Sequence, residues 1–136
     1  MAVDYGDART GIAVSDRTAT IAGDAWVVRE RNVKTLADTI LAEAAAREVS
    51  VIVLGHPINM DGTAGVRAEK SEALAELLRA RGADVKLWDE RRTTIAAHDI
   101  LSASNYHGQK RKDTVDAVAA TLILEGYLRK LALERE

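Results

Sequence analysis

Three acidic residues, far apart along the chain, are each adjacent in sequence to an apolar segment that we expect to be buried. Asp4 ends a short apolar run, Glu90 follows a second one, and Asp116 precedes the apolar segment at 117–124. Carboxylates without His or Cys partners are hard oxygen ligands, which suit Mg²⁺ or Mn²⁺. Gathered in one place, they could hold cations that activate a water and steady the leaving oxygen of a phosphodiester. These residue types therefore predict metal-dependent phosphodiester hydrolysis.

The first acid lies in the motif DYGDARTGIAVSD at 4–16. Asp4, Gly6, Arg9 and Gly11 form a D-x-G-x-x-R-x-G pattern, in which a glycine lets the backbone turn sharply beside the carboxylate. We predict that Asp4 is catalytic and binds metal, and that Arg9 contacts the substrate. The alternative is an ordinary hairpin, whose Asp and Gly residues only supply turn conformations.

The second acid lies in DERRTT at 89–94. Successive strand residues point to opposite faces, so one of Asp89 and Glu90 is expected to face the site. We assign Glu90 as the catalytic and metal-binding acid and Arg91 as a contact to the substrate. The alternative is a solvated strand end followed by a threonine helix cap.

The third acid lies in KRKDTVDAVAATLILEGYL at 110–128. Asp116 is predicted in the first turn of a buried helix, where a cation would offset the cost of burying its charge. Asp113, three residues earlier on the same helical face, could assist at the metal. The alternative is that acids in a first turn merely stabilise the helix dipole. A preceding loop carries Lys110, Arg111 and Lys112, interpreted either as a clamp for backbone phosphates or as a solvated charge run.

A fourth motif, GHPINMDGTAG at 55–65, joins a predicted strand to a predicted helix. Glycine-rich backbone at a helix N-terminus favours anions, and Asn59 and Thr63 could donate to a phosphodiester. Equally, Asp61 or Thr63 could simply cap the helix.

The elements that must position these residues follow from hydrophobic periodicity. Short apolar runs predict five strands, at 1–5, 11–15, 25–30, 51–55 and 85–89. Amphipathic spacing predicts helices around 36–44, at 64–81, from 93 or 94 to 101, and from about 114 onward. This order predicts an α/β fold with a mixed five-stranded sheet, three antiparallel strands followed by two parallel ones, and helices on both faces. Asp4 and Glu90 would then lie at the carboxyl ends of strands, where such sheets place their sites.

Composition narrows the class of protein. The length of 136 residues suits one domain, which we assign to residues 1–136. The absence of cysteine excludes disulfides and Cys-ligated zinc and suits a reducing cytosol. No signal peptide is recognisable, and the apolar run at 117–124 is far shorter than the roughly 20 residues of a membrane helix, so we expect no membrane partner. The formal net charge of −2 argues weakly against a nucleic-acid partner, although acidic ligands can hide basic patches in the sum.

Together, the four motifs resemble the YqgF family, also called RuvX, over essentially the whole chain. The resemblance implies a ribonuclease H-like fold and a divalent-metal nuclease of the bacterial cytoplasm. It places the family's acids on Asp4, Glu90 and Asp116 and its motif arginine on Arg9. Two features depart from the family pattern. Only three residues precede Asp4, and His56 occupies a position that is commonly apolar.

The resemblance favours the 5′ end of precursor 16S ribosomal RNA as the substrate, with branched DNA at a Holliday junction as the second candidate. Two other functions stay open. The first motif also resembles the phosphate-binding turn of sugar kinases and actin, which would imply nucleotide binding, and a non-catalytic nucleic-acid-binding module is the other. The sequence leaves open a monomer or a homodimer.

Overall fold

The computed structural model describes residues 1–57, 61–62, 65–89 and 108–135, with residues 108–114 described as backbone only. Its strands are β1 (Ala2–Asp4), β2 (Arg9–Ser15), β3 (Ala22–Arg29), β4 (Ile52–His56) and β5 (Val85–Asp89). Its helices are α1 (Val33–Ala46), α2 (Val66–Ala80) and α4 (Gly108–Glu134).

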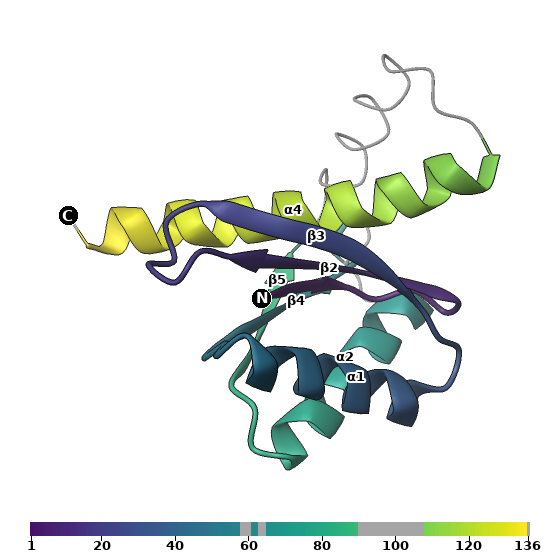
Figure 1. Ribbon diagram of the computed structural model, residues 1–136. Helices are drawn as coiled ribbons and strands as arrows, with labels where there is room; N and C mark the ends of the chain where they lie inside the picture. The colour runs from purple at the N-terminus through teal and green to yellow at the C-terminus, as the bar shows by residue number, and fades with distance from the viewer. Residues whose placement is uncertain (58–60, 63–64, 90–107, 136) are drawn as a thin grey trace.

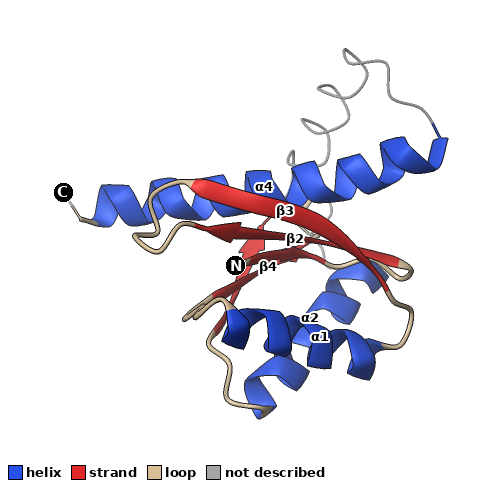
Figure 2. Ribbon diagram, in the orientation of Figure 1, coloured by secondary structure: helices blue, strands red, loops and turns tan. Residues whose placement is uncertain are grey.

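The strands form one mixed sheet (Figure 2), and their order across it is β3-β2-β1-β4-β5. The pairs β1–β2 and β2–β3 are antiparallel, whereas β4 lies parallel to both β1 and β5. This confirms the predicted sheet of three antiparallel strands followed by two parallel ones. It also makes β1, the strand that carries Asp4, the central strand.

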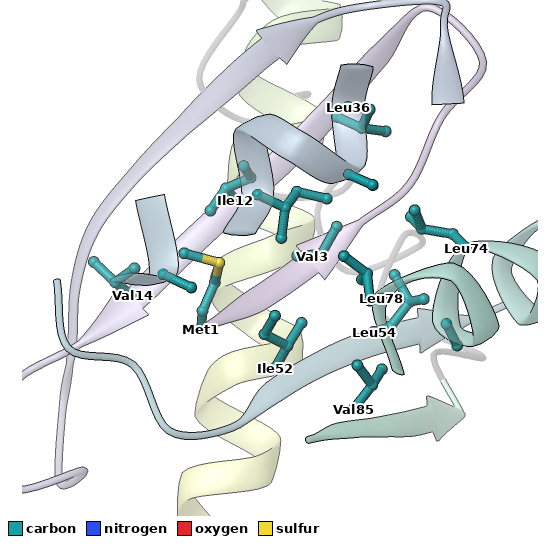
Figure 3. Packing of buried hydrophobic residues seen from close by; sticks show 14 residues of the cluster. Met1, Val3, Ile12, Val14, Leu36, Ile52, Leu54, Leu74, Leu78 and Val85 are labelled. Atoms are coloured by element: carbon teal, nitrogen blue, oxygen red, sulfur yellow. The ribbon is translucent and has the colours of Figure 1, made fainter. Parts of the chain in front are cut away.

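Helices cover both faces of this sheet, as predicted. Helices α1 and α2 lie together on one face, and the long α4 crosses the other (Figure 1). Alternation along each strand divides the apolar side chains between the two layers. Val3, Ile12 and Leu54 pack toward α1 and α2 (Figure 3), while Ala2 and Val53 pack toward α4.

Helix α1 begins where a side chain satisfies its first backbone donors. The side-chain oxygen of Asn32 accepts from the backbone N–H groups of Lys34, at 3.0 Å, and Thr35, at 3.1 Å. Such caps stabilise a helix by about 1 kcal/mol. The helix then buries Leu36 and Ile40, as their spacing predicts.

Helix α4 differs from the prediction in where it starts. It begins at Gly108 rather than near Thr114, so Lys110, Arg111 and Lys112 lie in the helix and the prediction of a loop there was wrong. The reason is that Gln, Lys and Arg are good helix formers, and high polarity does not by itself indicate a loop. No acidic residue lies in the first turn, so the helix-dipole explanation for Asp113 and Asp116 was also wrong.

Smaller differences concern the ends of elements. Strand β2 begins at Arg9, two residues earlier than predicted, which shortens the β1–β2 turn to residues 5–8. Strand β3 begins at Ala22 instead of residue 25. The short helix predicted to end at residue 101 lies outside the described residues.

An open hollow of about 700 Å³ lies at the amino ends of β1 and β4, the edge of the sheet opposite Asp4. Its lining includes Met1, Val51, Leu128 and Arg135. The Met1 α-amino group donates to the Val51 carbonyl at 3.0 Å, and burial lowers the pKa of this amine to about 6. Within the parts of the chain that the structure describes, no helix is long and apolar enough to span a membrane.

Candidate active site

Asp4 ends the central strand and is largely buried, with 8% of its surface exposed. It shares a strand face with Ala2, which packs toward α4. Across the β1–β2 ladder its partner is Gly11. The carboxylate therefore belongs to the α4 side of the sheet, at the edge where β1 and β4 end.

Gly11 brings α4 onto this part of the sheet. A Cβ atom at Gly11 would lie 2.0 Å from the carbonyl oxygen of Asp116 and 2.6 Å from its carbonyl carbon. These distances leave no room for any side chain, so glycine is required here by the close approach of a helix. Gly11 is thus the ladder partner of Asp4 and also touches the backbone of Asp116. Two of the three predicted acids are brought to the same place in this way.

Arg9 supplies a positive charge next to these acids. Its Nε donates to Oδ2 of Asp116 at 3.1 Å, and the two side chains are only 29% and 22% exposed. A partly buried, charge-assisted hydrogen bond of this kind holds both groups in a defined orientation. The sequence predicted Arg9 as a substrate contact but did not indicate its pairing with Asp116.

The turn between β1 and β2 is held in a tight conformation. A Cβ atom at Gly6 would lie 2.2 Å from the carbonyl oxygen of Arg9, so this glycine is also required by space. The fully buried Thr10 places its hydroxyl 3.4 Å from the Gly6 amide nitrogen and 3.5 Å from the Gly6 carbonyl oxygen. The turn therefore connects Asp4 to Arg9 through a compact four-residue segment.

The alternation of side chains along β5 places Asp89 and Trp88 on opposite faces of the sheet. Trp88 faces α4, where its ring packs edge-on against Tyr127 with ring centroids 6.0 Å apart. Val85 and Leu87 belong to the opposite layer, under α1 and α2. Asp89 is an even number of positions from Val85 and Leu87, so it lies on the same face of β5 as they do, away from α4. Its ladder partner is His56, whose Nε2 lies 2.9 Å from Oε1 of Glu72 on α2.

The remaining predicted site residues are not described in side-chain detail. Four of them lie outside the described residues, namely Asn59, Thr63, Glu90 and Arg91. Four lie in the first two turns of α4, where only the backbone is described, namely Lys110, Arg111, Lys112 and Asp113. Among the described residues, no three His, Asp or Glu side chains converge as metal ligands.

One ion pair at this edge was not predicted from the sequence. Lys70 of α2 reaches the β1–β2 turn, where its Nζ lies 2.9 Å from Oδ1 of Asp7. The hydrogen bond and charge of Lys70 lower the pKa of Asp7, and Asp7 in turn raises the pKa of Lys70. The 63 positions between the two residues explain why no local pattern indicates the contact.

Comparisons with known proteins identify relatives of this chain. A family profile described as "RuvX: Holliday junction resolvase" matches residues 1–130. A protein of Halothermothrix orenii is 38% identical over 94% of this chain and 92% of its own length. A protein of Clostridium novyi is 40% identical, over 94% and 96%. One of Myxococcus xanthus is 39% identical, over 94% and 85%. All three carry the name "Putative pre-16S rRNA nuclease".

Proposed function

Because the chain belongs to the RuvX family, whose fold is ribonuclease H-like, we propose that it is a metal-dependent nuclease acting on structured nucleic acid. The proposed substrate is precursor 16S ribosomal RNA, as the names of its relatives suggest, and the proposed place of cutting is its 5′ end. Its place of action is the bacterial cytoplasm, and residues 1–136 form one nuclease domain.

The observation that carries this proposal is the meeting of Asp4 and Asp116 at Gly11. Asp4 is buried, and Asp116 lies against its ladder partner and is paired with Arg9. Two carboxylates brought close together repel each other and lose solvation, and a bound cation offsets both costs. An all-oxygen donor set of this kind fits Mg²⁺ or Mn²⁺.

We assign Glu90 as the third metal-holding acid and Asp113 as a fourth ligand. Alternation along β5 supports Glu90, because Trp88 faces α4 and residue 90 has the same parity. A cation held by these residues would supply neutralising charge and an activated water. Arg9, fixed against Asp116, brings a further positive charge to where the phosphodiester would lie.

Further contacts to the substrate are assigned to residues around this centre. Lys110, Arg111 and Lys112 precede Asp116 on the same helix and would hold backbone phosphates. Asn59, Thr63 and Arg91 complete the proposed set.

The test is cleavage by the variants Asp4→Asn and Asp116→Asn, which remove a negative charge with little change in shape. With Mg²⁺ or Mn²⁺ and a labelled precursor 16S RNA, we expect cleavage to fall by at least about 100-fold, as it does when a group that stabilises the transition state is lost. Asp84→Asn, at the exposed position directly before β5, is the matched control and should cut normally. Undiminished cleavage by a folded Asp4→Asn/Asp116→Asn double variant would refute the proposal.

Resolution of Holliday junctions is the second candidate function, favoured by the description of the matching family. A labelled four-way DNA junction assayed in parallel separates the two, since this alternative predicts paired cuts in the junction and an intact RNA. Symmetric cutting needs two active sites, so it also predicts a homodimer rather than a monomer in solution. Binding without any cut product would instead indicate a non-catalytic module.

A further inference from the structure

The ion pair between Arg9 and Asp116 joins the sheet to the helix above it. Arg9 begins β2 and lies on the same face of that strand as Ala13, which packs toward α4, because side chains alternate along a strand. Its Nε donates to Oδ2 of Asp116 at 3.1 Å, and both side chains are mostly shielded from water. The fold therefore brings a fixed positive charge to the place where the acids meet.

The acids themselves are held at this place by packing. Asp4 is buried at the end of the central strand, and the backbone of Asp116 lies directly against Gly11. Two carboxylates that cannot move apart repel each other, and a positive charge beside them reduces the cost. Arg9 thus supplies, from within the chain, part of the charge that a bound cation would also supply.

We propose that Arg9 competes with the metal ion for Asp116 and so sets the metal affinity of the site. This inference rests on the proposed function, since it takes the acids to be metal ligands. The guanidinium engages Oδ2, one of the two oxygens that the Asp116 carboxylate could offer to a cation. Its charge also repels a divalent ion that approaches the same carboxylates, and this repulsion is strong where water is largely excluded. Both effects lower the metal affinity.

Two other roles of Arg9 lead to different expectations. An arginine that mainly orients Asp116 would raise the metal affinity, whereas one that only contacts the substrate would leave it unchanged in the free protein. Orientation is the weaker effect here, because Gly11 already fixes the backbone of Asp116. The usual partners that orient histidine ligands are carboxylates, carbonyl groups and water, which do not repel the ion as a guanidinium does.

The experiment measures Mn²⁺ binding to the protein without nucleic acid, by isothermal titration calorimetry. For Arg9→Gln, which removes the charge and keeps a polar side chain, we expect Mn²⁺ to bind about tenfold tighter, the size of effect that groups bonded to metal ligands produce. For Arg9→Lys, which keeps the charge, the affinity should stay closer to that of the parent. The matched control Arg129→Gln removes the same charge from an exposed position in the far half of α4 and should bind Mn²⁺ as the parent does.

Thermal unfolding gives a second readout that does not depend on cleavage. In EDTA, Arg9→Gln should melt below the parent, because it loses a partly buried ion pair between β2 and α4. With the same concentration of Mn²⁺ added, its melting temperature should rise by more than that of the parent, since a ligand that binds more tightly stabilises the folded state more. If Arg9→Gln folds neither in EDTA nor in excess Mn²⁺, the inference fails, because a bound cation should replace the lost charge.

The other outcomes separate this inference from the proposed function. Equal Mn²⁺ affinities for Arg9→Gln and Arg129→Gln would overturn the inference and leave Arg9 as a substrate contact. Weaker Mn²⁺ binding by Arg9→Gln would also overturn it and would indicate the orienting role. In both cases the proposed function stands. If the parent protein binds no Mn²⁺ and cuts neither the precursor RNA nor the DNA junction in its presence, the proposed function itself fails.

Discussion

At the scale of single residues, the position that brings the two described acids together is a glycine. Gly11 pairs with Asp4 across the ladder and leaves room for the backbone of Asp116. The spacing of the first motif identified Gly11 but not its purpose, because the contact joins segments more than 100 positions apart. The same is true of Arg9 and Asp116, which are 107 positions apart. Sequence patterns report local spacing, and these contacts exist only after the sheet and α4 have packed.

The substitution Gly11→Ala tests whether the close approach of α4 at Gly11 positions Asp116. The added methyl would lie 2.0 Å from the Asp116 carbonyl oxygen, so α4 must move away from β2. We expect the free energy of unfolding to fall by about 1–3 kcal/mol, as in other overpacked cores, and cleavage to fall as well because Asp116 moves with the helix. Denaturant unfolding and the cleavage assay measure the two effects.

Gly23→Ala is the matched control, since its Cβ would meet only the Val14 carbonyl oxygen, at 3.2 Å. If Gly11→Ala were as stable and as active as Gly23→Ala, the close approach of α4 would not be what positions Asp116.

At the scale of elements, the strands and the first two helices follow from the sequence and the start of α4 does not. Alternating and continuous apolar runs mark strands β1 to β5, and amphipathic spacing marks α1 and α2. The run of Gln, Lys and Arg before Asp113 carries no apolar periodicity, so the pattern gave no sign that the helix extends through it. Glu90 and the connection between β4 and α2 belong to the proposed site, and the sequence motifs alone support them, together with the alternation along β5 in the case of Glu90.

The β2–β3 connection gives a prediction at this scale. The Asp16 carboxylate accepts hydrogen bonds from the Thr18 hydroxyl, the Thr20 amide at 2.8 Å and the Ile21 amide at 3.2 Å. These hydrogen bonds, of which the one from Thr18 has the largest effect, lower the pKa of Asp16 below its ordinary value of 3.8. A carboxyl group whose pKa is lower in the folded state stabilises the fold above its unfolded pKa and loses that effect as the pH falls.

We therefore expect Asp16→Ala to lower the melting temperature at neutral pH and the difference from the parent to shrink below about pH 4, where the parent carboxylate also becomes protonated. Melting curves recorded from pH 8 to pH 3 measure this. Thr18→Val, which removes the first of the donors, should reproduce part of the pH-dependent loss. A difference that is the same at pH 7 and pH 3 would contradict this account.

At the scale of the whole molecule, the ribonuclease H-like architecture was predictable and the distribution of charge was not. The order of strands and helices restricts the topology, because connections are short and parallel strands need a crossover. The formal net charge of −2 argued against a polyanionic partner, but Arg9 lies at the candidate site, paired with Asp116, and Lys70 lies beside it, paired with Asp7. A sum over the chain cannot show where charges lie, since that depends on which turn meets which helix.

The hollow at the amino ends of β1 and β4 suggests how the chain could be circularly permuted. Met1 and Arg135 both border it, so a flexible linker that follows the hollow could join the first and last described parts of the polypeptide. A Gly/Ser bridge would serve as this linker, and the chain could be reopened between Gly82 and Ala83, in the turn after α2. We expect this circular permutant to unfold cooperatively and to keep the parent's cleavage rate, because both cuts in the connectivity lie away from Asp4 and Asp116. Calorimetry and the RNA assay would show it, and a permutant that folds but no longer cleaves would mean that the edge with the hollow helps to hold the distant acids in place.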